Sequence, residues 1–154
     1  MKTVLLVTAN DGLRSRLRRP LGNRSIFSAT IGPEAIEALQ VTEVDLIVAD
    51  AASGGLRAFS EFAAQARELA PGAVLIGIGD DDGIAEAADF RLAAAFEHRD
   101  LVAVLRQAEE RHRLVQELTA LRLMAPGRAS EPNGRTEAPD MSARGLEQAL
   151  KEFA

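Results

Sequence analysis

The sequence predicts an α/β fold, a doubly wound parallel β-sheet of five strands with helices on both faces. From residue 3 onward, short apolar runs alternate with helical patterns. Strands that alternate with helices imply right-handed crossovers and a parallel sheet covered on both faces. The apolar run 46–49 also ends abruptly at one carboxylate, Asp50, followed by a Gly54-Gly55 turn. In open α/β sheets, the carboxyl ends of buried strands carry the functional sites.

The elements follow from the apolar spacing. The first strand is a run of Val and Leu, and the helix after it repeats Leu13 and Leu17 on one stripe. Ser and Thr interrupt the second strand, which favours a position at the sheet edge. The predicted strands are 3–8, 25–31, 45–49, 73–78 and 92–96. The predicted helices are 11–21, 33–40, 56–69, 83–88 and 100–124.

The last of these helices is longer than the domain requires. No Gly or Pro interrupts residues 100–124, so the helix spans roughly 37 Å at about 1.5 Å per residue. Its first half carries an apolar stripe that suits the sheet. Its second half carries Leu114, Leu118 and Leu121 at heptad-like spacing. We therefore expect a domain at 1–113 and a projecting helix end at 114–124 whose leucines form a dimer seam.

A change of composition follows the long helix. Residues 125–141 are rich in Pro and Gly and lack large apolar side chains apart from Met141, which predicts a flexible linker. Residues 142–154 repeat apolar side chains at helical spacing after Ser142, a suitable N-cap. So short a helix is marginal alone, so it either docks on something or begins a further domain.

Composition excludes several classes of function. The 154 residues include no Cys and only two His, so disulfides, thiol nucleophiles and thiolate metal sites are excluded. The formal net charge of -5 argues against broad electrostatic binding of nucleic acid. No apolar run approaches the roughly 18 residues of a membrane-spanning helix. We expect a cytoplasmic protein that contacts neither nucleic acid nor membrane.

Four stretches resemble a known family. They are the Leu13, Arg14 and Leu17 pattern of the first helix, Gly32-Pro33-Glu34-Ala35-Ile36, the strand 45–50 and Pro71 before the strand 74–76. Over about residues 2–113 the chain is similar to the receiver domain of two-component response regulators. The resemblance implies a flavodoxin-like sheet in the order 2-1-3-4-5, with Asp50 at the phosphoacceptor position.

The metal-binding positions of the family are altered. Phosphorylation of the family's aspartate requires Mg²⁺, which prefers near-octahedral oxygen ligands and neutralising charge. The resemblance places the family's acidic pair at Thr8 and Ala9, and Ala9 offers no ligand. Asp11 could serve as a displaced ligand beside Asp50 only if the loop were remodelled.

The remaining positions of the family's site are altered as well. The resemblance aligns the hydroxyl residue after the fourth strand with Gly79, which has no hydroxyl to move. The lysine after the fifth strand aligns with His98, and a neutral imidazole does not replace a fixed ammonium. Phosphotransfer by the family mechanism is therefore not expected.

Each of these features also has a purely structural interpretation. Asp50 could be a strand-end carboxylate held by backbone N–H groups. The acidic run 80–82 fits a solvated loop or a cap for the helix 83–88 better than a metal cluster. His98 fits a surface or satisfied histidine, and the four arginines in 14–19 fit the solvated face of a helix.

The sequence thus favours a pseudo-receiver, a non-enzymatic signalling module that needs no cofactor and acts through contacts with a protein partner it does not identify. A homodimer formed through the last helix is expected. The alternative is a phosphoaccepting receiver that uses Asp50 with Asp11 and Mg²⁺. A third possibility is the N-terminal regulatory fragment of a larger regulator.

Overall fold

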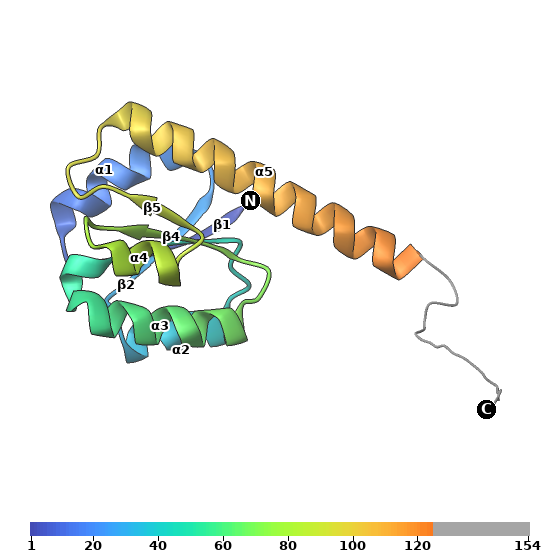
Figure 1. The fold of residues 1–154 in the computed structure, drawn as a ribbon, viewed down its shortest axis with the longest axis horizontal. Helices are drawn as coiled ribbons and strands as arrows, with labels where there is room; N and C mark the ends of the chain where they lie inside the picture. Colours follow the sequence, from blue (N-terminus) through green and yellow to red (C-terminus); the bar gives the residue numbers. More distant parts are fainter. Residues whose placement is uncertain (125–154) are drawn as a thin grey trace. The chain divides into compact units, whose positions relative to one another are not determined.

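A computed structural model describes residues 1–124, and the predicted linker 125–141 and helix 142–154 lie outside the described residues. The strands are β1 (Thr3–Val7), β2 (Ser25–Ala29), β3 (Leu46–Asp50), β4 (Val74–Ile78) and β5 (Phe90–Leu92). The helices are α1 (Asp11–Leu21), α2 (Pro33–Val41), the 3₁₀ turn η1 (Ala51–Ser53), α3 (Gly55–Leu69), α4 (Asp82–Ala87) and α5 (His98–Met124). All neighbouring strands are parallel, in the order β2-β1-β3-β4-β5, which confirms the predicted fold and strand order (Figure 1). The sheet lies in a compact unit, Met1–Leu114.

Two apolar layers cover the sheet, one on each face. On one face, α1 and α5 pack against alternate strand residues such as Leu6, Val48 and Ile76. On the other face, α2, α3 and α4 pack against the residues between them, such as Leu5 and Ile47 (Figure 1). Because side chains alternate along a strand, successive residues of a strand face opposite layers. This alternation decides which side chains can meet at the end of the sheet.

The fifth strand differs from its predicted position. It spans Phe90–Leu92, whereas the apolar pattern predicted 92–96. Phe96 is buried, but it lies in a turn closed by the hydrogen bond from Phe96 N to the carbonyl oxygen of Ala93, 3.0 Å long. Phe96 therefore belongs to the loop that leads into α5, and its ring is buried against α1 and α5. The helix accordingly begins at His98, two residues earlier than predicted.

The contact between β4 and α4 is unusually close. Two glycines of the β4 segment, Gly77 and Gly79, face the layer that contains Phe59 and Ile84. A Cβ atom at Gly77 would lie 2.5 Å from Cγ2 of Ile84 and 2.6 Å from Cζ of Phe59, so no side chain fits there. A Cβ atom at Gly79 would lie 2.4 Å from Cδ1 of Ile84. The short helix α4 is thus held against the sheet by Ile84, which fills the space that the two glycines leave.

The carboxylate of Asp89 joins three elements, β4, α3 and α5. Asp89 lies just before β5, and its Oδ2 accepts a hydrogen bond of 2.8 Å from the backbone N–H of Leu75 in β4. Its Oδ1 lies 3.4 Å from the guanidinium groups of Arg67 in α3 and Arg111 in α5. The Asp89 side chain is buried, whereas both arginines are about half exposed. Asp89 therefore links both helical layers to the sheet.

The second half of α5 exposes large apolar side chains. Leu114, Leu118 and Leu121 are 47%, 54% and 64% exposed. Residues 115–124 continue the helix that covers the sheet in its first half. Among residues 1–124, no helix combines the length and apolar character needed to cross a membrane.

Candidate functional site

The site is built around Asp50, the last residue of β3. Its side chain belongs to the layer of α1 and α5, because it alternates with Val48 on that face of the sheet. Asp50 is only 8% exposed. It lines a cavity of about 400 Å³ together with Asn10, Gly12, Leu13, Arg16, Ala52, Ile78 and Ala94. Among these residues Asp50 is the only acid.

Both carboxylate oxygens of Asp50 already accept hydrogen bonds from the protein. The hydroxyl groups of Thr8 and Ser53 each donate to Oδ2 at 3.2 Å. The backbone N–H of Ala52 donates to Oδ1 at 3.1 Å. A buried carboxylate that receives three donors is stabilised as an internal acceptor. The interpretation of Asp50 as a strand-end carboxylate held by backbone N–H groups accounts for one of the three bonds, and hydroxyl groups supply the other two.

The same two hydroxyl groups tie down the loop after β1. The backbone N–H of Ala9 donates to Oγ of Ser53, and that of Asn10 donates to Oγ1 of Thr8, both at 3.0 Å. The two hydroxyl oxygens lie 3.4 Å apart. We call Thr8, Asp50 and Ser53 the hydroxyl–carboxylate cluster. Thr8 is one of the altered metal positions, whereas no sequence pattern pointed to Ser53. Ser53 lies three residues after Asp50, and the turn η1 brings its hydroxyl group back to the carboxylate.

The residues at this site do not fit Mg²⁺. The ion needs near-octahedral oxygen ligands, and its sites in proteins draw on carboxylates that neutralise its charge. Here one carboxylate faces the cavity, and hydroxyl donors are aimed at its Oδ2. The Ala9 side chain has no ligand atom, and its backbone N–H donates to Oγ of Ser53. Within residues 1–124, no group of three or more His, Asp or Glu side chains could hold a metal ion.

Asp11, the possible displaced metal ligand, does not line the Asp50 cavity. It is the first residue of α1, its side chain is 90% exposed, and it pairs with Arg14. It is not among the residues that line the Asp50 cavity. The structure therefore does not bring the two carboxylates to a common cavity. Arg14 also donates a hydrogen bond of 2.8 Å to the carbonyl oxygen of Thr8, so this arginine is not simply part of a solvated helix face.

The residue opposite Asp50 on β4 is Ile78, whereas the resemblance had pointed to Gly79. In the parallel pairing of β3 with β4, Asp50 is the partner of Ile78. Ile78 is buried and lines the Asp50 cavity, whereas a Cβ atom at Gly79 would point toward Ile84 in the other layer. The aligned position was one residue too late, since alternate residues face opposite sides of the sheet. The conclusion that this position lacks a hydroxyl group holds for Ile78 as well.

A similar correction applies after β5. Ala94, not His98, lines the cavity beside Asp50. His98 is the first residue of α5 and lines a different cavity, between α1 and α5. Ala94 carries no charge, and its backbone N–H donates to Oδ1 of Asp80 at 3.1 Å. Arg16 is the only basic residue that lines the Asp50 cavity. It therefore differs from the solvated helix face predicted for the arginines of α1.

The acidic run 80–82 has structural roles. Asp81 is the N-cap of α4, where its Oδ1 accepts a hydrogen bond of 2.9 Å from the backbone N–H of Gly83. This confirms the capping interpretation. Asp80 holds the loop after β5 through Ala94.

Comparison with known proteins gives structural neighbours only. No family model matches the chain, and no curated protein matches it. Among solved structures, the signal receiver domain of an HD domain-containing protein from Pseudomonas fluorescens Pf-5 has a TM-score of 0.65 and 25% identity, covering 75% of this chain and 92% of that one. The chemotaxis response regulator CheY4 of Vibrio cholerae has a TM-score of 0.62 and 18% identity, covering 70% and 98%.

Another structure, described as the adenylate cyclase from Rhodopirellula baltica, has a TM-score of 0.70 and 17% identity, covering 80% of this chain and 98% of that one. The neighbours include several response-regulator receiver domains. The strand order found here is that of the flavodoxin-like fold. The chain therefore has the flavodoxin-like fold of CheY-like receiver domains.

Proposed function

We propose that this chain is a pseudo-receiver, a non-enzymatic module of two-component type that works through protein contacts and does not accept a phosphoryl group at Asp50. Its likeness to receiver domains supports a role in signalling. The departures at its site support the loss of phosphoryl transfer.

The hydroxyl–carboxylate cluster is the observation that carries this proposal. To attack a phosphoryl group, an Asp50 oxygen must be free and the developing charge must be stabilised by a metal ion or by fixed cations. Instead, Thr8 and Ser53 bind Oδ2, Ala52 binds Oδ1, and Ile78 and Ala94 present apolar side chains. The site is arranged to hold a carboxylate rather than to use it as a nucleophile.

Incubation of the chain with acetyl phosphate and Mg²⁺ is expected to leave its intact mass unchanged. A phosphoaccepting receiver treated in parallel serves as the positive control for the reagent. A stoichiometric phosphoryl adduct on the wild-type chain that is absent from Asp50→Asn would contradict the proposal and establish the alternative with Asp50 as phosphoacceptor.

We further propose that the second half of α5 forms a parallel homodimer. Leu114, Leu118 and Leu121 follow one another at intervals of four and three residues, the spacing of a coiled-coil seam. Full burial of an exposed leucine is worth roughly 1.5–3 kcal/mol. These three side chains are 47–64% exposed, so each contributes about half of that, and the sum over both copies supports a weak dimer after the cost of association. Arg111, which falls on the same stripe, pairs with Asp89 within its own chain.

Sedimentation of the double variant Leu114→Glu, Leu118→Glu is expected to give a monomer at concentrations where the wild-type chain is a dimer, because four glutamates would meet in the seam. The matched control is Gln116→Glu, Ala120→Glu, which adds the same charge to exposed positions outside the seam. A wild-type chain that stays monomeric at high micromolar concentration would refute the dimer, as would equal effects of the two variants.

A further inference from the structure

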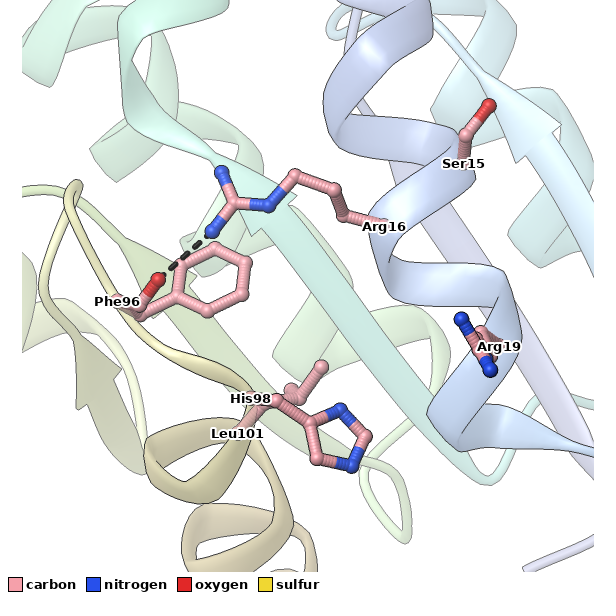
Figure 2. A pocket seen from close by; sticks show the side chains of 6 residues that line it. All are labelled: Ser15, Arg16, Arg19, Phe96, His98 and Leu101. Atoms are coloured by element: carbon pink, nitrogen blue, oxygen red, sulfur yellow. Dashed lines mark hydrogen bonds between the residues drawn. The ribbon is translucent and has the colours of Figure 1, made fainter.

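A second cavity, of about 350 Å³, lies between α1 and the start of α5. Its lining residues are Ser15, Arg16, Arg19, Phe96, His98 and Leu101 (Figure 2). The volume is within the range of small-molecule sites, which combine an apolar wall with a few converging polar groups. Phe96 and Leu101 supply the apolar wall, and the basic side chains come from two different helices.

Arg16 is fixed in position before any ligand arrives. Its guanidinium donates a hydrogen bond of 2.7 Å to the carbonyl oxygen of Phe96, and it lies over the Phe96 ring at 4.2 Å from the centroid (Figure 2). A cation–π contact and a hydrogen bond hold the planar group while leaving other N–H donors available. Less side-chain entropy is therefore lost when this arginine binds an anion.

Arg19 and His98 provide two further donors. Within residues 1–124, neither side chain has a hydrogen-bond or ion-pair partner. His98 also begins a helix, whose positive dipole end favours an anion. Figure 2 shows Arg16 and Arg19 on α1 and His98 on α5 around the same space.

No carboxylate lines this cavity. The nearby acids are engaged outside it, since Glu97 pairs with Arg99 and Asp100 accepts a hydrogen bond from the backbone N–H of Glu97. The neighbouring Asp50 cavity shares Arg16 but contains the Asp50 carboxylate, which repels anions. In a chain of net charge -5, the cavity between α1 and α5 is therefore a local positive site.

We propose that the cavity between α1 and α5 binds a small organic phosphate, with the phosphoryl oxygens at Arg16, Arg19 and His98 and the organic part against Phe96 and Leu101. Guanidinium groups match phosphate oxygens in charge and geometry. Three separate donor side chains suit the three oxygens of a phosphate ester better than the two of a carboxylate. This site is independent of phosphorylation at Asp50.

Titration of the full chain with phenyl phosphate, followed by NMR of ¹⁵N-labelled protein, tests the proposal. Shifts are expected at the amides of residues 15–19 and 96–101, with a dissociation constant in the millimolar range or tighter. Benzoate and inorganic phosphate are expected to bind at least about tenfold more weakly, a difference of 1.4 kcal/mol in binding free energy. Equal binding of benzoate would overturn the phosphate assignment, and the absence of saturable shifts would overturn the site.

Two charge-matched variants separate a local site from the general charge of α1. Arg19→Gln is expected to weaken phenyl phosphate binding about tenfold or more. Arg18→Gln removes the same charge from the same helix, but Arg18 contacts Ser28 and does not line the cavity. We expect less than about a twofold change for this control. Equal losses in the two variants, with both folded by circular dichroism, would refute the assigned site.

Discussion

Replacement of Phe59 by alanine is expected to lower the free energy of unfolding by about 3–5 kcal/mol. The Phe59 ring is fully buried on α3 and fills the space above Gly77, where even a Cβ atom would collide with it. Its removal leaves a cavity between α3, α4 and β4. That cavity cannot collapse easily, since Ile84 already packs against the same face of Gly77 beside the ring. Urea denaturation with linear extrapolation measures the loss.

Phe27→Ala is the matched control, because it removes the same ring from β2, an edge strand of the sheet. Phe27 is 45% exposed, so the loss should be about 1 kcal/mol or less. Similar losses in the two variants would show that the close contact at Gly77 does not stabilise the fold as described.

Asp89→Ala is expected to lower the free energy of unfolding by about 2–3 kcal/mol. Most of the loss comes from the backbone N–H of Leu75, which would be left without its buried acceptor at a cost of about 1–3 kcal/mol. The ion pairs with Arg67 and Arg111 add less, because both guanidinium groups are about half exposed to water. Urea denaturation again provides the measurement.

Asp89→Asn separates the two contributions. The asparagine keeps an acceptor for the Leu75 N–H but loses the charge, so we expect a loss of about 1 kcal/mol or less, which added salt should reduce further. If the asparagine variant were as unstable as the alanine variant, the ion pairs would dominate and the assigned role of the hydrogen bond would be wrong.

Most of the fold could be predicted from the sequence because the buried strands are continuous apolar runs. β3 and β4 are buried on both faces, and such strands are recognisable without knowledge of their partners. β5 was misplaced because it is a short edge strand, and the apolar residues after it belong to a turn. Phe96 is buried by its contacts with α1 and α5. Contacts of this kind cannot be predicted from local periodicity.

The candidate site was predictable in part. Asp50 stood out because a carboxylate ended an apolar run. Which residue of β4 faces Asp50 depends on the register of the two strands. The prediction was off by one residue and named Gly79 in place of Ile78, a position that faces the other side of the sheet. Strict alternation from Val74 would have assigned Ile78 to the face of Asp50. The hydrogen bond from Ser53 to Asp50 depends on the 3₁₀ turn η1. No periodic pattern in the sequence predicts this turn.

The arrangement around Asp50 also bears on how this chain could change by mutation. Its surrounding residues, Thr8, Ser53, Ile78 and Ala94, come from segments that follow or end different strands. Under the proposed function, no one substitution supplies a second carboxylate, a hydroxyl group in place of Ile78 and a cation in place of Ala94. Each single substitution would leave the other positions unchanged. If the proposed function is correct, phosphoryl transfer at Asp50 would therefore require several substitutions together.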